Sequence, residues 1–254
     1  MQTNSARLPA RRSGVTVAPD AREAARLVAA RIVAFMKEKP DAVLGLATGA
    51  TMEPVYAELV AAYRAGNVSF ASASTFNLDE YVGLASEHPA AYRSTMNRLL
   101  FDHVDIDKTR THVPDGHASD PSAAAARYEA AIAATGPIDL QLLGIGRNGH
   151  IGFNEPGSPL DSRTRVVELH SSTLDANRAF FPDGRMPHFA ITMGIATILQ
   201  ARRILLLATG PAKRDAVVRA HAGGFDIDCP ASALSGHANV EWIVDAEAAA
   251  GLSG

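Results

Sequence analysis

Residues 144–159, GIGRNGHIGFNEPGSP, place five glycines around one histidine, two asparagines and one glutamate. Glycine allows the backbone to approach a ligand closely, and imidazole is the side chain whose ordinary pKa lies nearest neutral pH. A histidine oriented by a carboxylate can act as acid and base, so His150 with Asn148 and Glu155 is suited to opening a sugar ring or moving a proton beside a carbonyl. The sequence therefore predicts a catalytic loop, although a structural histidine held by Glu155 fits the same spacing.

A second group that could do chemistry lies in NLDEY, residues 77–81, where two carboxylates follow an apolar run. Alternation along an extended chain sends Asp79 and Glu80 to opposite sides, so we expect one of them to face a pocket. An aspartate at a strand end also forms turns and caps helices. Asp79 is a candidate base because of the groups that we expect near it.

Two further turns are suited to binding an anion. In ATGAT, residues 47–51, backbone N–H groups and two hydroxyls from Thr48, Gly49, Ala50 and Thr51 lie between a predicted strand and a predicted helix. In ATGPAK, residues 208–213, Lys213 stands at a helix start, where the helix dipole disfavours a cation without an anionic partner. Ordinary strand-to-helix turns with a solvated lysine fit the same residues. Together with the central loop, these turns favour a phosphate ligand.

Several common sites do not match this sequence. His150 and Glu155 lack a third ligand at a recognisable spacing, which disfavours a metal site. A GxSxG nucleophile elbow and a GxxxxGK[ST] loop are absent from the sequence, and neither of the two anion-binding turns is a GxGxxG loop.

Apolar runs that alternate with helical patterns predict the elements that position these groups. This alternation indicates an α/β fold of the doubly wound, Rossmann-like kind, with a mostly parallel sheet and helices on both faces. We expect strands at 42–47, 72–78, 138–146, 202–210 and 240–246, and helices at 20–39, from about 52, at 88–104 and at 119–136. The four polar turns follow predicted strands, and such turns share the carboxyl edge of a parallel sheet, where ligands bind.

One domain is the simplest reading of residues 1–254. We expect residues 1–16 to be a flexible tail, and residues 158–187, where the pattern weakens, to be a mobile lid with one strand at 164–170 and a short helix after Ser171.

The composition narrows the class of protein. With 254 residues, of which 47% are hydrophobic and 20% charged, the chain can bury a substantial core. A net charge of -3 gives no global attraction to nucleic acid or to an anionic membrane. Cys229 is the single cysteine, and no apolar segment is long enough to span a bilayer. We therefore expect a cytoplasmic protein with a small-molecule substrate.

The segments FNLDEYVGL (76–84) and LLGIGRNGHIGFNEPGSPLDSRTR (142–165), with the LATGAT and TGPAK turns, resemble the glucosamine-6-phosphate deaminase family, also called glucosamine-6-phosphate isomerase. The resemblance extends from about residue 41 to the end of the chain. It implies a doubly wound fold, no metal and no organic cofactor, and conversion of glucosamine 6-phosphate and water into fructose 6-phosphate and ammonia. We also expect a homo-oligomer.

The resemblance also implies roles for single residues. Asp79 matches the base that moves a proton from C2 to C1, His150 the residue that opens the pyranose ring, and Glu155 the carboxylate that orients His150. Lys213, with Thr48 to Thr51, matches the phosphate site.

Three positions differ from the family's best-studied branch. Asn148 replaces an aspartate and still can orient the ring. That branch places a phosphate-binding arginine where this chain has Ala179, and Arg178 stands one residue earlier, about 100° away around a helix. Ser158 and Arg165 match a site for the activator N-acetylglucosamine 6-phosphate, but Val167 replaces a lysine, so we expect weak or absent activation.

Other functions stay open at this point. They are a 6-phosphogluconolactonase, which shares a glycine-flanked histidine without the FNEP continuation, a galactosamine-6-phosphate deaminase, and a sugar-phosphate-binding protein without catalysis. A DNA-binding regulator of this fold would need a helix-turn-helix, for which the chain before the first helix is too short.

Overall fold

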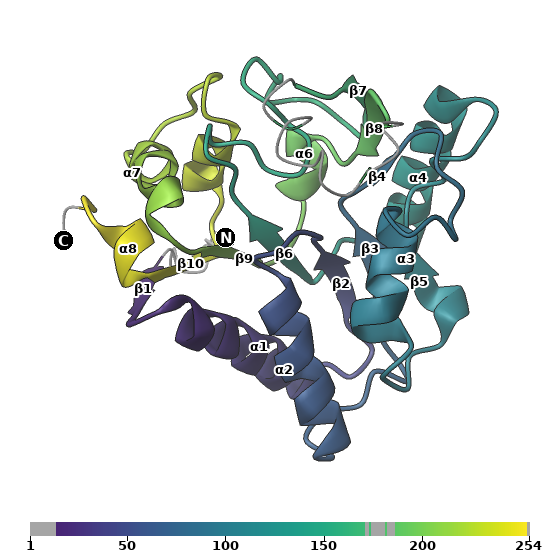
Figure 1. Cartoon of the computed structure of the whole chain (residues 1–254), viewed down its shortest axis with the longest axis horizontal. Helices are drawn as coiled ribbons and strands as arrows, with labels where there is room; N and C mark the ends of the chain where they lie inside the picture. The colour runs from purple at the N-terminus through teal and green to yellow at the C-terminus, as the bar shows by residue number, and fades with distance from the viewer. Residues whose placement is uncertain (1–13, 171–172, 174–180, 182–185, 253–254) are drawn as a thin grey trace, which may run out of the picture.

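The computed structural model describes residues 14–170, 173, 181 and 186–252. Within them, seven parallel strands form one sheet in the order β1-β10-β9-β6-β2-β3-β5, as Figure 1 shows. The strands are β1 (Gly14–Ala18), β2 (Val43–Leu46), β3 (Ser74–Asn77), β5 (Thr111–His112), β6 (Leu140–Gly144), β9 (Ile204–Ala208) and β10 (Val240–Asp245). The strand order reverses between β2 and β6. A doubly wound parallel sheet was predicted from the alternation of apolar runs and helical patterns, and it is confirmed.

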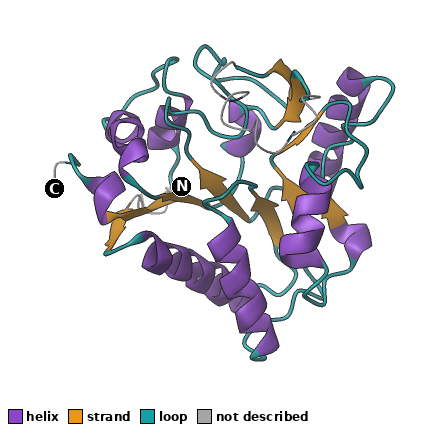
Figure 2. Ribbon diagram, viewed as in Figure 1, coloured by secondary structure: helices purple, strands orange, loops and turns teal. Residues whose placement is uncertain are grey.

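Helices cover both faces of this sheet (Figure 2). They are α1 (Ala21–Glu38), α2 (Glu53–Arg64), α3 (Tyr92–Met96), α4 (Pro121–Thr135), α6 (Ile195–Ile198), α7 (Arg214–His221) and α8 (Ala246–Ala249). Right-handed crossovers place α1, α2 and α3 on one face and α4, α6 and α7 on the other. Helix α1 begins as predicted, because the Asp20 carboxylate accepts a hydrogen bond from the Glu23 N–H at 2.8 Å.

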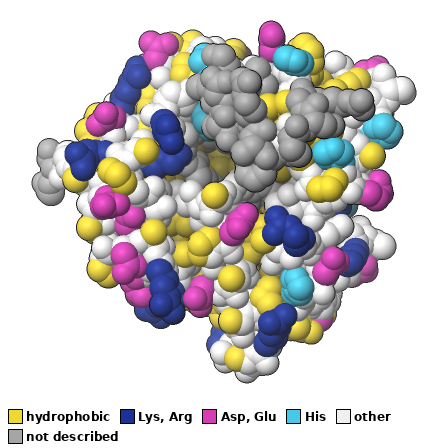
Figure 3. All heavy atoms as spheres, in the orientation of Figure 1, with side chains coloured by type: hydrophobic (Ala, Val, Ile, Leu, Met, Phe, Trp, Pro, Cys, Tyr) yellow, Lys and Arg dark blue, Asp and Glu magenta, His cyan; other side chains and the backbone are white. Residues whose placement is uncertain are grey.

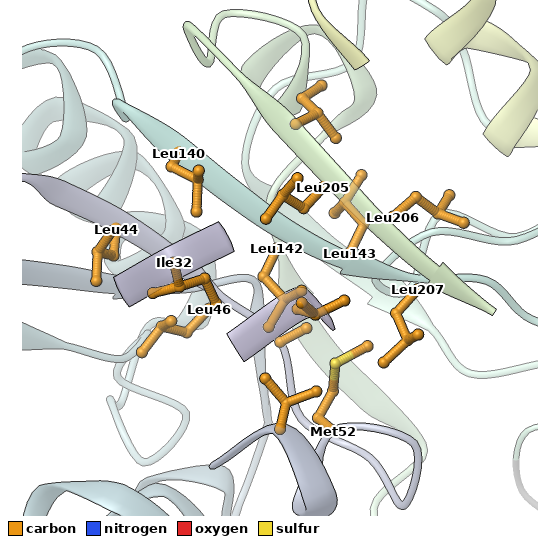
Figure 4. Close-up of a cluster of buried hydrophobic side chains, with 14 of the residues drawn as sticks. Ile32, Leu44, Leu46, Met52, Leu140, Leu142, Leu143, Leu205, Leu206 and Leu207 are labelled. Atoms are coloured by element: carbon orange, nitrogen blue, oxygen red, sulfur yellow. The ribbon is translucent and has the colours of Figure 1, made fainter. Parts of the chain in front are cut away.

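The centre of the fold is an aliphatic core between the sheet and the helices (Figure 4). The middle strands contribute a continuous set of leucines, and α1 and the start of α2 add Ile32 and Met52. The labelled leucines are all buried: Leu44, Leu46, Leu140, Leu142, Leu143, Leu205, Leu206 and Leu207. Strands that are buried on both faces have this unbroken apolar pattern, which explains why the sequence indicated them. This core holds the carboxyl ends of β2, β6 and β9 in fixed positions.

A second, smaller sheet lies beside the carboxyl edge of the first. It is antiparallel, in the order β4-β8-β7, and consists of β4 (Asp79–Tyr81), β8 (Phe189–Thr192) and β7 (Arg165–Glu168). The strand expected at 164–170 is β7. Residues 77–81, predicted as a polar turn, instead enter this sheet through β4, because Asp79 pairs with Thr192. The antiparallel sheet therefore carries the candidate base.

Two other predictions were wrong in part. Residues 14–16, assigned to a tail, begin strand β1, which pairs with β10 at the sheet edge. The helix predicted for 88–104 occupies only 92–101, as α3 followed by the π-helical turn η1 (Asn97–Phe101). Pro89 disfavours helical backbone at His88, and residues 88–91 form a turn instead.

The charged side chains on the face in Figure 3 are interspersed, with acidic and basic groups alternating across it. That face has no continuous basic area, in agreement with the small net charge.

Candidate active site

The turns after β2, β3, β6 and β9 lie at one edge of the sheet, because these four strands are neighbours and run parallel. The reversal of strand order between β2 and β6 is the position where ligands bind in open α/β sheets. The sequence-predicted groups of all four turns are thus brought to the same side of the molecule.

Asp79 is buried at the start of β4, with 6% of its surface exposed. Its carboxylate accepts no hydrogen bond from any described residue. Burial, and then the negative charge of Glu80, raise the pKa of Asp79 to about 8. A carboxyl with such a pKa can exchange a proton near neutral pH.

Glu80 points the other way and has a structural role. Its carboxylate accepts hydrogen bonds from the backbone N–H groups of Tyr92 at 2.9 Å and Arg93 at 2.9 Å, at the start of α3. The N-cap residue of that helix, Ala91, has no capping side chain. Glu80, which lies outside α3, therefore accepts hydrogen bonds from N–H groups that the first turn of this helix leaves free. Its side chain points away from that of Asp79, as the alternation along the strand predicted.

The central loop follows β6 and contains a chain of hydrogen bonds that ends on the His150 ring. Asn148 Nδ2 donates to Glu155 Oε2 at 2.6 Å, and Asn148 Oδ1 lies 2.7 Å from His150 Nδ1. The Glu155 carboxylate lies 3.3 Å from the same ring nitrogen and accepts a 2.5 Å hydrogen bond from Thr173 Oγ1. Burial alone would raise the pKa of Glu155, but the hydrogen bond and charge of His150, with the bonds from Thr173 and Asn148, outweigh it and lower the pKa to about 2.

This chain determines the tautomer of a neutral His150. A carboxylate only accepts, so Asn148 must turn its NH2 group to Glu155 and its oxygen to His150. The ring nitrogen Nδ1 must then carry a hydrogen, which leaves the lone pair on Nε2. His150 is in this way oriented to accept or return a proton through Nε2.

At two positions of the loop, neighbouring side chains lie so close to the backbone that only glycine fits. A Cβ on Gly146 would lie 2.2 Å from Cε1 of His150, so the ring packs directly on this residue. A Cβ on Gly152 would lie 2.9 Å from Thr192 Oγ1 and 3.3 Å from Asp79 Oδ2, and the φ of Gly152 is +55°. The loop therefore contacts His150 at one glycine and Asp79 at another.

Lys213 reaches the same loop from the turn after β9. Its ammonium donates a 2.6 Å hydrogen bond to the carbonyl of Ile145, and burial, then the charge of Arg147, lower its pKa. Residues 48–51 follow β2, the neighbour of β6 in the sheet, and lead to α2, whose N-cap Met52 makes no side-chain capping bond. Lys213 and Arg147 form no ion pair with any described carboxylate, and together with the uncapped helix start they favour an anion here.

Comparison with known proteins decides the family. A sequence model of the family described as "Glucosamine-6-phosphate isomerases/6-phosphogluconolactonase" matches residues 18–242. The chain belongs to this family. Relatives within it include the glucosamine-6-phosphate deaminase of Cellvibrio japonicus, which is 54% identical over 240 residues, 94% of this chain and 91% of the relative. The glucosamine-6-phosphate deaminase of Rhodopirellula baltica is 52% identical over 239 residues, 94% of this chain and 95% of the relative.

Solved structures of the family share the fold. A structure described as a monomeric glucosamine-6-phosphate deaminase has a TM-score of 0.90 and 46% sequence identity, and the match covers 92% of this chain and 98% of the other. The 6-phosphogluconolactonase of Trypanosoma brucei has a TM-score of 0.78 with 22% identity, covering 95% of this chain and 99% of the other. The second likeness concerns the fold alone.

The family pattern also named residues outside the catalytic loop and the phosphate turns. Arg178 falls outside the described residues, as do residues 171–172, 174–180 and 182–185 of the segment predicted as a lid, so their roles stay predictions. Arg165, on β7, donates hydrogen bonds to Asn154 at 2.9 Å and to Ser158 at 3.3 Å, and burial lowers its pKa. Val167, on the same strand, packs against the cluster of buried side chains around Tyr81.

Thr173 was missed by sequence reasoning. It belongs to the weakly patterned segment, and its contact with Glu155 depends on the path of the chain between the two residues. A lone threonine 18 positions away carries no signal of such a contact.

The described part of the chain offers neither a metal site nor a helix that could span a membrane. No group of three or more histidine, cysteine, aspartate or glutamate side chains there is arranged to hold a metal ion. Among the helices of that part, none has the length and apolar character needed to cross a membrane.

Proposed function

We propose that this chain is a glucosamine-6-phosphate deaminase, which converts glucosamine 6-phosphate and water into fructose 6-phosphate and ammonia. The observation that carries the proposal is the convergence of Asp79 and His150 on one glycine-rich loop, since Gly152 lies against Asp79 two residues after His150. The names of the relatives support the same activity.

Ring opening is the step that His150 serves. The ring oxygen must gain a proton while the hydroxyl at C1 loses one, and a group with an available Nε2 can move both. Asn148 and Glu155 hold the ring in the required tautomer, and the negative charge of Glu155 stabilises the imidazolium that forms during the transfer.

Isomerisation and deamination follow in the open chain. Asp79 takes the proton from C2, the electron pair of that bond forms the C1–C2 double bond of an enolamine, and the aldehyde oxygen takes a proton from solvent, which is released again when water adds to the iminium. Asp79 then returns the proton at C1, which leaves an iminium at C2. Water adds to C2, and ammonia leaves to give the ketose. A pKa near 8 suits Asp79 to both halves of this exchange.

The substrate's phosphate is placed at the other end of the site. Lys213, Thr48 to Thr51 and the start of α2 supply a cation, hydroxyls and backbone N–H groups for its oxygens. Arg178 is a further candidate from the family pattern.

A panel of three substrates tests this function against its alternatives. The enzyme is given glucosamine 6-phosphate, galactosamine 6-phosphate and 6-phosphogluconolactone, and ammonia, ketose phosphate and acid release are measured. We expect ammonia and fructose 6-phosphate from the first substrate, with the highest kcat/KM. Lactone hydrolysis without ammonia would establish the lactonase alternative instead, and binding of all three without turnover would establish a non-catalytic binder.

Activation by N-acetylglucosamine 6-phosphate is expected to be weak or absent. Val167 faces the cluster around Tyr81 and offers no charge to a second phosphate beside Arg165. The apparent affinity for substrate is measured with and without that sugar phosphate, and a clear increase on adding it would contradict this expectation.

Homo-oligomerisation and a cytoplasmic location also stay predictions. One relative of known structure is described as monomeric. Light scattering on the purified full chain measures the mass in solution, and fractionation of expressing cells measures the location.

A further inference from the structure

Asp245 is a buried carboxylate that the mechanism above does not use. It is the last residue of β10, and only 3% of its surface is exposed. One oxygen, Oδ1, accepts a 2.8 Å hydrogen bond from the Ala248 N–H and so caps α8. The other oxygen, Oδ2, accepts a 2.8 Å hydrogen bond from the N–H of Gly210.

Gly210 begins the turn that carries Lys213. The turn is the short helix η4 (Pro211–Lys213), and the Lys213 N–H donates back to the Gly210 carbonyl at 3.2 Å. Its other end is held by the Lys213 ammonium on the Ile145 carbonyl. The turn is therefore tied to β10 through Asp245 and to the loop after β6 through Lys213.

The cap of α8 does not require the hydrogen bond between Asp245 and Gly210. Asp120 caps α4 through one carboxylate oxygen, which accepts from the Ala123 N–H at 2.9 Å, and its carboxylate makes no other hydrogen bond among the described residues. Helix α8 has four residues, so its cap alone gives little reason for a doubly bonded, buried carboxylate. A charged acceptor makes a stronger hydrogen bond than a neutral one, and here that bond holds the anion-facing turn.

We propose that Asp245 is a positioning residue for phosphate recognition, which fixes the turn from Gly210 to Lys213 so that the Lys213 ammonium meets the substrate's phosphate. The inference rests on the proposed function in so far as the ligand is a sugar phosphate. Binding groups must be held within about half an ångström of the productive geometry, so release of the turn weakens phosphate binding. Asp79 and His150, which serve the reacting end of the sugar, are not among the described groups that hydrogen-bond to the Asp245 carboxylate.

The test separates the two bonds of Asp245. Asp245→Ser keeps a preferred N-cap for α8 but has a single oxygen, so it cannot also hold Gly210. Asp120→Ala is the matched control, because it removes a cap of the same kind from a helix outside the phosphate site. Binding of inorganic phosphate is measured by calorimetry, and KM, kcat and Tm are measured for glucosamine 6-phosphate turnover.

We expect Asp245→Ser to weaken phosphate binding and to raise KM about tenfold, with kcat within about threefold of wild type. Asp120→Ala should lower Tm and leave both affinities unchanged. Phosphate affinity in Asp245→Ser equal to wild type would overturn the proposal. So would a loss of kcat without a change in KM.

If Asp245 acts by positioning Lys213, the loss of phosphate affinity in Asp245→Ser requires the Lys213 side chain. In a Lys213→Ala background, Asp245→Ser should change phosphate affinity by less than about twofold, because the group that it positions is already gone. An undiminished tenfold loss in that background would contradict the positioning role. The calorimetric readout needs no turnover, so a wild-type protein that binds phosphate but forms no ammonia would refute the proposed function while leaving this inference testable.

Discussion

Asn148 and His150 are joined by a 2.7 Å contact between the amide Oδ1 and the ring Nδ1, and this contact determines which end of the imidazole faces the substrate. The amide cannot turn over, because its NH2 group is bonded to Glu155. An asparagine at this position is therefore compatible with an oriented, reactive histidine.

The first prediction concerns that tautomer. Nitrogen NMR of the labelled protein, at a pH where the ring is neutral, should show His150 with its hydrogen on Nδ1 and with an unprotonated Nε2. In Asn148→Leu the preference should be lost and kcat should fall about 10- to 100-fold, as for other groups that orient a reactive side chain. A hydrogen on Nε2 in the wild-type protein would contradict the network described here.

Glu155→Gln tests the carboxylate at the other end of the chain. Its pKa is lowered to about 2 in the folded protein, so it contributes stability above its unfolded pKa and loses that contribution as the pH falls toward 2. We expect kcat to fall about 10- to 100-fold. The Tm advantage of wild type over the variant should shrink between pH 7 and about pH 3. A constant Tm difference over that range would be inconsistent with the lowered pKa.

The pH dependence of kcat/KM reports on Asp79. Because burial and Glu80 raise its pKa to about 8, the rate should rise along an acid limb near that value. Glu80→Gln removes the negative charge, which is the smaller of the two causes of the raised pKa. The acid limb of the pH profile should therefore move to lower pH by less than about one unit. Glu87→Gln, on the exposed loop that follows, is the control and should leave the limb in place. An acid limb near pH 4 in wild type would show that Asp79 has an ordinary pKa.

Because Asp79 is buried, its ionisation at high pH should lower the stability of the fold. A carboxyl whose folded pKa is raised stabilises the fold fully below its unfolded pKa of about 4, and that contribution is lost as the pH rises through about 8. Asp79→Asn carries no charge at any pH. Its Tm relative to wild type should therefore increase from pH 5 to pH 9 by at least about 2 °C, which corresponds to about 1 kcal/mol. A relative Tm that falls over this range would have the wrong sign.

The sequence was sufficient for the five inner strands of the main sheet, because strands that are buried on both faces have largely apolar runs. The two edge strands, β1 and β5, were not predicted. The sequence was insufficient for the small antiparallel sheet, whose strands β4 and β8 have three and four residues and lie more than 100 positions apart. Residues 14–16 of β1 were assigned to a tail because an exposed edge strand has no continuous apolar run. Strand-like alternation nevertheless separated Asp79 from Glu80 before their contacts were known.

The site was predictable where its groups are local in the sequence. Asn148, His150 and Glu155 are within eight residues and meet as expected. Thr173 and Asp245 reach the site only through the tertiary path of the chain, and neither has a sequence motif around it. Patterns of residues therefore indicated the reacting groups, while the groups that hold them required the structure.

The role of Asp79 as the base is the central claim, and one measurement tests it most directly. Ammonia and fructose 6-phosphate are measured from glucosamine 6-phosphate with wild type and Asp79→Asn, and phosphate binding is measured on the same samples. We expect equal amounts of the two products from wild type, and a loss of at least about 10²-fold in the variant with unchanged phosphate affinity. Turnover by Asp79→Asn at the wild-type rate would contradict it.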